Sequence, residues 1–226
     1  MPPIVQRSLF ALYYPYCGMV ARILPNITLD GLKLRVLPGV YKPLDSEHHL
    51  IDFIEADKRV LDVGCGSGVI TVFAALKSKH VTAIDISPRA IENTRQNCQT
   101  HNIENVTIKQ SNMYAEVEDE RFDYIMSYPP LYEGAFESQD QQWCTSNNFV
   151  QDLFKGASEH LEPGGKLIVL LPKNFRVSPM ELSQQYKLEF ESAVAHHNRS
   201  FATRLHGLPY LHFNMNNHVF TFRRLP

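Results

Sequence analysis

The segment at residues 59–76 constrains the fold of this chain more than any other. It begins with the apolar pattern of a buried strand, continues with alternating Gly64, Gly66 and Gly68, and ends in apolar residues that indicate a helix. Glycine lets the backbone turn tightly and admits a ligand where a Cβ would block it. A new helix also offers unpaired N–H groups. The pattern predicts a nucleotide-type pocket at the carboxyl end of a parallel strand.

The spacing of the glycines narrows the choice of ligand. A dinucleotide-binding turn has glycine at its first, third and sixth positions, whereas Gly68 comes one residue early. A second expected strand, at residues 80–86, carries Asp85 about twenty residues after Gly64, where a carboxylate can accept ribose hydroxyl groups. A nicotinamide site, or an ordinary strand–helix turn without a cofactor, are the alternatives.

In these features the chain resembles the class I S-adenosylmethionine-dependent methyltransferases. Their first motif corresponds to residues 60–68, and the acid of their second strand corresponds to Asp85. The resemblance implies S-adenosyl-L-methionine as cofactor, with Asp62 reaching its methionine ammonium group directly or through water. The expected cofactor-binding residues are Tyr41, Asp62, Gly64, Cys65, Gly66, Asp85, Ile86, Asn112, Met113 and Ser127.

Asn112 and Met113 follow the third expected strand. In the resembled family an acid at the position of Asn112 commonly receives the adenine amino group, and an amide oxygen can accept the same hydrogen bond. Met113 can pack on the adenine face. A polar residue capping a strand end, and a methionine in the core, are the plainer interpretations.

A Tyr-Pro-Pro-Leu sequence, at residues 128–131, follows the fourth expected strand. Consecutive prolines fix a rigid extended turn that can hold an acceptor at a set distance. The sequence resembles the Asn-Pro-Pro-aromatic motif of methyltransferases that act on amino groups of adenine, guanine or protein glutamine. Tyr128 replaces the amide-binding Asn and Leu131 replaces the stacking aromatic, so specificity does not transfer directly. We expect Tyr128 and Pro129 to be the catalytic residues that contact the acceptor; a purely structural turn is the alternative.

The segment before the glycine turn, at residues 37–47, also carries a resemblance. It is similar to the segment that covers the methionine end of the cofactor in release-factor glutamine methyltransferases and ribosomal guanine methyltransferases. The resemblance puts Tyr41 near the sulfonium. A helix is expected to begin at Glu47, where an acid suits the positive end of the helix dipole. An ordinary loop and helix start would account for the same residues.

Strand and helix patterns alternate along the chain, which predicts an α/β fold with helices on both faces of a parallel sheet. The resemblance implies a Rossmann-like, seven-stranded, mostly parallel sheet with a C-terminal antiparallel strand. We expect a methyltransferase domain at residues 41–226 and an N-terminal extension at residues 1–40, a possible acceptor lid. Further strands are expected at 106–110, 122–127, 166–171, 187–191 and 218–222, and further helices at 88–102, 148–161 and 179–186.

Composition and charge limit the classes of partner that are expected for this chain. The length of 226 residues suffices for one such domain. A formal net charge of −2 and an isoelectric point of about 6.5 give no global basic field that would attract nucleic acid. We therefore expect a small-molecule or peptide-like substrate, no membrane partner and no stable nucleic-acid binding, with a macromolecular substrate as the alternative.

Cysteine and histidine spacing argue against metal and disulfide chemistry. The four cysteines form no Cys-x-x-Cys pair, and the histidines of the C-terminal third lack the regular spacing of metal ligands. Free thiols suit the cytoplasm. The aromatic segment at residues 9–14 loosely imitates a signal peptide, but Pro15 interrupts it and it is too short to span a bilayer. We interpret it as a packed helix-and-turn element or a lid.

These features together predict a cytoplasmic transferase that moves a methyl group from S-adenosyl-L-methionine, in line, to a nitrogen or oxygen of its acceptor. A hydroxyl acceptor would need a general base, either Tyr128 or a histidine, whereas a neutral amine would not. N-methylation of protein glutamine or of a ribosomal RNA base is one alternative. A cofactor-binding interaction module without catalysis is another.

Overall fold

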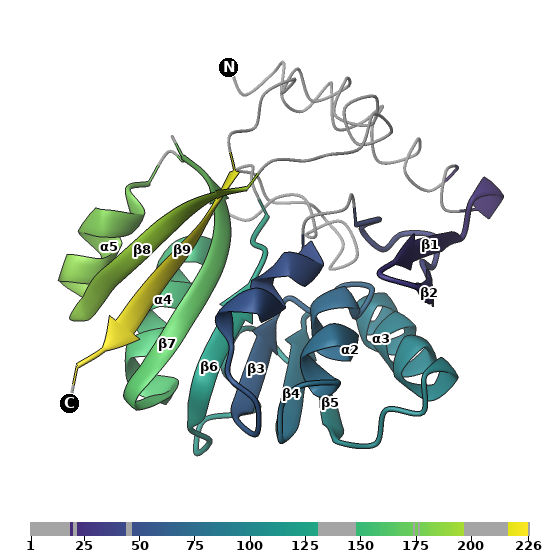
Figure 1. Cartoon of the computed structure of the whole chain (residues 1–226), viewed down its shortest axis with the longest axis horizontal. Coiled ribbons are helices and arrows are strands. Elements are labelled where there is room, and N and C mark those ends of the chain that lie inside the picture. The colour runs from purple at the N-terminus through teal and green to yellow at the C-terminus, as the bar shows by residue number, and fades with distance from the viewer. Residues whose placement is uncertain are drawn as a thin grey trace.

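The computed structural model describes residues 19, 22–43, 47–130, 148–173, 175, 177–196 and 217–225. Their centre is a seven-stranded sheet in the order β5-β4-β3-β6-β7-β9-β8 (Figure 1). The strands are β3 (Arg59–Val63), β4 (His80–Asp85), β5 (Val106–Gln110), β6 (Phe122–Ser127), β7 (Leu161–Pro172), β8 (Leu188–His196) and β9 (Asn217–Arg224). All are parallel except β9, which pairs antiparallel with β7 and β8. The expected mostly parallel sheet with a C-terminal antiparallel strand is confirmed.

Helices cover both faces of this sheet (Figure 1). One face carries η1 (Glu47–Phe53), α2 (Val69–Ala75) and α3 (Pro88–Thr100), and the other carries α4 (Phe149–His160) and α5 (Pro179–Gln185). Because side chains along a strand alternate between faces, the apolar core is divided in two. Val60 packs with η1 and α2, whereas the next residue, Leu61, packs with α4.

Two elements differ from the sequence-based expectation. The helix expected to start at Glu47 is a 3₁₀-helix. The strand expected at residues 166–171 begins earlier, because β7 already pairs with β6 through Leu161 and Phe122. The pairing shifts register there, and Gly164 takes a φ of 80°. A strand can contain such an irregularity where glycine supplies the left-handed conformation.

A short antiparallel hairpin, β1 (Asn26–Leu29) and β2 (Leu32–Arg35), precedes the sheet. Its strands have four residues each, which is too short for a periodic pattern to predict them. Leu34 is fully buried and packs with Phe73 of α2. The boundary between the expected extension and the domain, at residue 40, stays a prediction.

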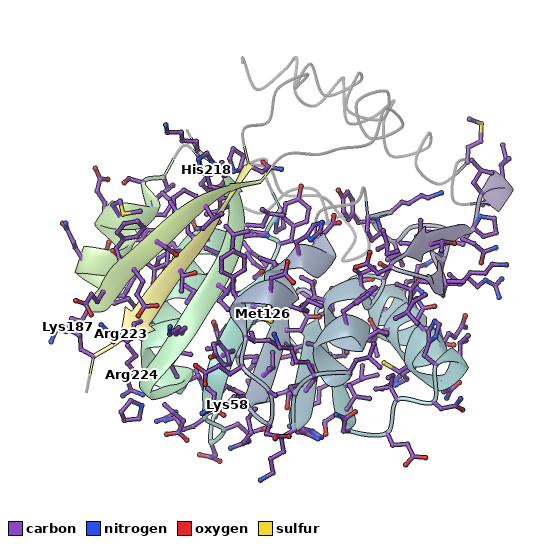
Figure 2. The ribbon with its side chains drawn as sticks, viewed as in Figure 1. Lys58, Met126, Lys187, His218, Arg223 and Arg224 are labelled. Atoms are coloured by element: carbon purple, nitrogen blue, oxygen red, sulfur yellow. The ribbon has the colours of Figure 1, made fainter. Side chains whose placement is uncertain are left out.

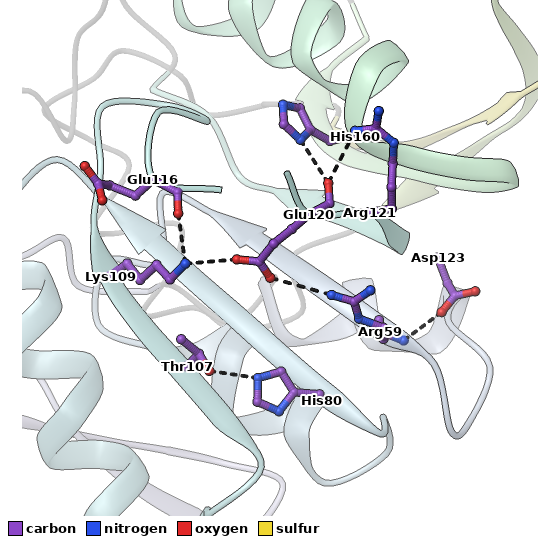
Figure 3. Close-up of polar contacts among 9 residues, drawn as sticks. All are labelled: Arg59, His80, Thr107, Lys109, Glu116, Glu120, Arg121, Asp123 and His160. Carbon is purple, nitrogen blue, oxygen red and sulfur yellow. Dashed lines mark hydrogen bonds and ion pairs between the residues drawn. The ribbon is translucent and has the colours of Figure 1, made fainter. Parts of the chain in front are cut away.

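A polar cluster links the start of β3, the start of β6 and Lys109 of β5 (Figure 3). Lys109 Nζ donates to Glu120 Oε1 at 2.9 Å, and the other carboxylate oxygen of Glu120 lies 3.6 Å from the Arg59 guanidinium. The Arg59 backbone N–H donates to Asp123 at 2.8 Å. The cluster therefore joins β3, β5 and β6, with Arg59 and Asp123 at the edge of the sheet opposite the glycine turn.

Gly156 of α4 packs directly against the ring of Tyr114, because it has no side chain. This contact leads to a prediction about stability. A Cβ at Gly156 would overlap the ring of Tyr114, which stacks on His160 at 4.7 Å and donates its hydroxyl to the Leu153 carbonyl at 2.9 Å. We expect Gly156→Ala to lower the free energy of unfolding by about 2 kcal/mol, although alanine is the better helix former.

Urea denaturation checks this expectation. The matched control is Lys155→Ala, at an exposed position of the same helix, which should change the free energy of unfolding by less than about 0.5 kcal/mol. A Gly156→Ala protein as stable as wild type would contradict the packing described.

Candidate cofactor and acceptor site

The glycine turn joins β3 to α2, and all three of its glycines have left-handed backbone. Their φ angles are 78° at Gly64, 56° at Gly66 and 81° at Gly68. The Gly64 N–H donates to the Ile84 carbonyl at 2.8 Å, which fixes the turn to the end of β4. The nearest neighbour of a Cβ at Gly66 would be the Gly64 carbonyl oxygen at 3.9 Å, whereas a Cβ at Gly68 would lie 3.0 Å from Thr94 of α3. Gly66 therefore leaves room beside the turn, and Gly68 permits close helix packing.

Asp85, at the end of β4, supports the turn with both carboxylate oxygens. Oδ2 accepts the Gly66 N–H at 2.9 Å, and Oδ1 accepts the Ser87 N–H at 2.9 Å. Ser87 also caps α3, because its hydroxyl accepts the Ala90 N–H at 3.3 Å. A carboxylate oxygen can accept more than one hydrogen bond, so these contacts are compatible with the predicted ribose contact.

Asp62 is fully buried in β3 below the glycine turn. Its Oδ2 accepts the Thr71 hydroxyl at 2.6 Å, while its Oδ1 has no hydrogen-bond partner among the described residues. Burial raises the pKa of Asp62 from 3.8 to about 7. A buried carboxylate oxygen without a donor fits the predicted ammonium group of the cofactor, since a cation would satisfy it.

The raised pKa of Asp62 predicts how stability depends on pH. Between about pH 4 and pH 7 the folded protein keeps a proton on Asp62 that the unfolded chain has released. Raising the pH through this window therefore favours unfolding. Asp62→Asn removes this effect, so its free energy of unfolding should gain up to about 4 kcal/mol relative to wild type between pH 4 and pH 7.5.

Urea denaturation of the cofactor-free protein at both pH values measures the effect. Asp119→Asn, in an exposed loop, is the control and should follow wild type at both. A constant difference between Asp62→Asn and wild type would show that Asp62 is already ionised at pH 4.

The expected adenine side of the site lies at the ends of β4 and β5. Asn112 is exposed, Ile86 is half-buried, and Met113 is half-buried against the core with a φ of 51°. Ser111, which the sequence did not single out, orders this turn. Its N–H donates to the Asp85 carbonyl at 2.9 Å, and its hydroxyl donates to the Met113 carbonyl at 2.7 Å. The Ser111–Asp85 hydrogen bond therefore holds the neighbouring Asn112 near the end of β4.

The expected acceptor side lies at the end of β6. Ser127 is buried and donates its hydroxyl to the Val63 carbonyl at 2.8 Å, which ties β6 to β3. Tyr128 is half-buried, and its ring centre lies 6.0 Å from that of Tyr41 in an edge-to-face contact at 64°. Pro129 is buried. The structure thus brings Tyr41 and Tyr128 together from distant parts of the sequence.

The cofactor contact expected of Cys65 stays a prediction, and several other residues considered from the sequence are not described by the structure. Cys65 is buried in the glycine turn and accepts a hydrogen bond from the Thr94 hydroxyl at 3.3 Å. Burial raises the pKa of its thiol well above the usual value, so it is neutral. The following lie outside the described residues: Leu131, Cys17, Cys144, His197, His206, His212 and the segment at 9–14.

Two residues of α3 that the sequence did not single out hold the turn from the side. The Thr94 hydroxyl donates to the Gly66 carbonyl at 3.2 Å. The Asn97 amide donates to the Ser67 carbonyl at 2.8 Å and to the Arg35 carbonyl at 2.7 Å. Polar residues three apart on the inward face of a helix are a signal that could have identified them.

The family model of the methyltransferase small domain matches residues 32–199, which is most of the chain. The chain belongs to this family. The predicted class of S-adenosylmethionine-dependent methyltransferases, with that cofactor, is therefore confirmed at the level of the family. The roles of the individual residues of this methyltransferase small domain stay predictions.

Curated relatives of this methyltransferase small domain include ribosomal RNA methyltransferases. The ribosomal RNA small subunit methyltransferase C of Yersinia pestis is 38% identical over 149 residues, which cover 63% of this chain and 40% of the relative. The Escherichia coli protein of the same name is 35% identical over 150 residues, with 63% and 41% covered. The chain thus spans about two fifths of the length of these relatives.

Solved structures show the same fold. A methyltransferase from Pyrococcus furiosus matches with a TM-score of 0.66 and 20% identity, covering 98% of this chain and 99% of that one. The T. thermophilus 16S rRNA N2 G1207 methyltransferase, solved with AdoMet and guanosine, matches with a TM-score of 0.64 and 16% identity, covering 88% and 49%. The likeness confirms the Rossmann-like fold.

The sequence-based prediction about partners is wrong. It favoured a small-molecule or peptide-like substrate without stable nucleic-acid binding, whereas the curated relatives are named as ribosomal RNA methyltransferases. The physical reason is that a net charge of −2 is a sum over the whole chain, whereas a local basic surface is sufficient for contact with RNA. None of the helices in the described ranges is long and apolar enough to cross a membrane.

Proposed function

We propose that this chain is an S-adenosylmethionine-dependent methyltransferase that modifies the exocyclic N2 amino group of a guanine in small-subunit ribosomal RNA. The observation that carries the proposal is the 38% identity, over 63% of this chain, to a ribosomal RNA small subunit methyltransferase C. The fold likeness to a 16S rRNA N2 methyltransferase solved with guanosine agrees with it. The cytoplasmic location stays a prediction.

Several observations at the carboxyl edge of the sheet support the proposed cofactor residues. The cofactor, when bound, supplies a methyl group on a positively charged sulfur. Gly66 leaves room beside the turn, Asp85 offers carboxylate oxygens to the ribose, and the unsatisfied Oδ1 of buried Asp62 receives the ammonium group. Asn112, exposed at the end of β5, is available to the adenine amino group.

The Tyr41–Tyr128 pair forms the wall for the acceptor base. Unpaired bases in RNA are commonly held by stacking on aromatic side chains and by hydrogen bonds to their edges. Tyr128 supplies both a ring and a hydroxyl, which can accept or donate one hydrogen bond. An exocyclic amine attacks as the neutral group and loses its proton afterwards, so these residues need only position it and exclude water.

Incubation of the purified chain with labelled cofactor and 30S ribosomal subunits or free 16S rRNA tests the function. Digestion of the RNA should release labelled N2-methylguanosine. The Asp85→Ala variant tests the cofactor site. It loses two hydrogen bonds to backbone N–H groups, so S-adenosylhomocysteine binding should weaken at least tenfold in calorimetry. The amount of label in the RNA should fall as well.

Other outcomes distinguish the alternatives. Label in a release-factor protein instead of the RNA would indicate glutamine methylation. Binding of S-adenosylhomocysteine without methyl transfer to an extract, to ribosomal subunits or to RNA would indicate a non-catalytic module. Undiminished binding by Asp85→Ala would contradict the cofactor site.

Tyr128 should act on the acceptor and not on the cofactor. We expect Tyr128→Ala to lower kcat/KM for the RNA about tenfold or more, because one base-stacking contact is worth about 1–3 kcal/mol. Tyr128→Phe keeps the ring beside Tyr41 and should lose less. Steady-state kinetics with RNA and calorimetry with S-adenosylhomocysteine separate the effects. Two results would contradict the assignment of Tyr128 to the acceptor site: wild-type kinetics in Tyr128→Ala, or a loss of cofactor binding as large as the loss of kcat/KM.

A further inference from the structure

The β1–β2 hairpin presents a polar, cationic face to solvent. Lys33 and Arg35 alternate with buried Leu34 along β2, so the two cations share one face. Their partners across the hairpin are Thr28 and Asn26 respectively. All four polar residues are exposed, while Leu34 turns into the core. The hairpin therefore has one face for the protein and one that is available to a partner.

The cations of this face differ from those at the far edge of the sheet. Figure 2 shows Lys58, Arg223 and Arg224 at the amino edge, away from the glycine turn. There, Lys58 lies 3.9 Å from the Asp123 carboxylate, and Arg223 lies 2.7 Å from that of Glu189. Within the described ranges, neither Lys33 nor Arg35 forms an ion pair. Their charge is therefore available to an anion.

The distribution of charge along the chain points the same way. Residues 1–43 contain five Lys and Arg against one acid, Asp30, whereas residues 44–226 contain 17 Lys and Arg against 23 acids. A polyanion is attracted by the first segment and repelled, on average, by the second. Four of the five cations belong to the described segment at 22–43, around the hairpin.

A polar stripe on α3 fixes the hairpin in place. Asn93, Asn97 and His101 follow each other at intervals of four residues, so they lie on one helix face. Asn97 Oδ1 accepts the Arg35 N–H at 2.8 Å, Asn93 Oδ1 accepts the Leu37 N–H at 2.8 Å, and a His101 ring nitrogen lies 2.9 Å from the Lys33 carbonyl. The helix thereby pairs the outer edge of β2.

The same stripe connects the hairpin to the glycine turn. The Asn97 amide nitrogen donates both to the Arg35 carbonyl, at 2.7 Å, and to the Ser67 carbonyl, at 2.8 Å. One buried side chain thus joins β2 to the turn that carries the expected cofactor contacts. A partner held on the outer face of the hairpin would have a set position relative to that turn.

We propose that Lys33 and Arg35, with Thr28 and Asn26 across the hairpin, bind the phosphate backbone of the RNA substrate and set its position relative to the cofactor. The proposal rests on the proposed function. Alternate residues of a strand are roughly 7 Å apart, so the two cations can contact neighbouring phosphates. Side-chain amide and hydroxyl groups such as those of Asn26 and Thr28 commonly add contacts to phosphate and sugar oxygens.

The test compares two double variants of the full chain. Lys33→Ala with Arg35→Ala removes the hairpin charges, and Lys79→Ala with Lys155→Ala removes two exposed lysines elsewhere. Affinity for 16S rRNA is measured over a series of salt concentrations. We expect the hairpin variant to bind about tenfold more weakly and its salt dependence, as log Kd against log salt, to fall by about 1 to 2. The control should match wild type, and both should bind S-adenosylhomocysteine as wild type does.

Unchanged RNA affinity and salt slope in the hairpin variant, or an equal loss in the control, would overturn the proposal. The pair Lys33→Gln and Arg35→Gln, which keeps polar side chains, should repeat the result if the alanine pair lowers the melting temperature. A wild type that does not bind RNA would overturn this proposal and the proposed function together. If the wild type binds RNA through the hairpin but transfers no methyl group to it, only the proposed function is overturned. If methyl transfer to RNA is the same in the hairpin variant as in wild type, only the present proposal is overturned.

Discussion

The glycine turn can be open to a ligand only if its own backbone groups are bound from other directions. Asp85 accepts the Gly66 N–H from below, and the Ile84 carbonyl accepts the Gly64 N–H. From the side, Thr94 and the amide of Asn97 bind turn carbonyls. Buried backbone groups without partners are costly, so this arrangement is what lets three left-handed glycines remain ordered. Through Thr94 and Asn97 the turn is also bound to α3 and to the hairpin.

The parts of this arrangement that the sequence predicted are those with a local pattern. The glycine spacing, the acid at Asp85 and the alternation of strands and helices are all readable within short windows. The small hairpin was missed because its pattern is only four residues long in each strand. Thr94 and Asn97 were missed because a polar residue inside a helix looks solvent-exposed until its partners, which are distant in sequence, are known.

Ser127 and the class of partner illustrate two further limits of prediction from sequence. The cofactor contact expected of Ser127 stays a prediction, while its hydroxyl binds the Val63 carbonyl of the neighbouring strand. That bond could not be predicted, because strand neighbours cannot be read from a single segment. The partner class was misjudged because net charge is a sum, whereas recognition depends on where the charges lie. The contact between Tyr41 and Tyr128 likewise joins two segments that no local pattern connects.

The position of β9 constrains the order in which the sheet can form. Because β9 lies between β7 and β8, β8 has no strand to pair with until residues 217–224 have been synthesised. Until then Phe190 and Val194, which stay partly exposed even in the finished fold, belong to an unpaired strand. Unpaired strands of this kind are prone to wrong association during folding. The sheet is therefore complete only once β9 bridges two strands that precede it in the chain.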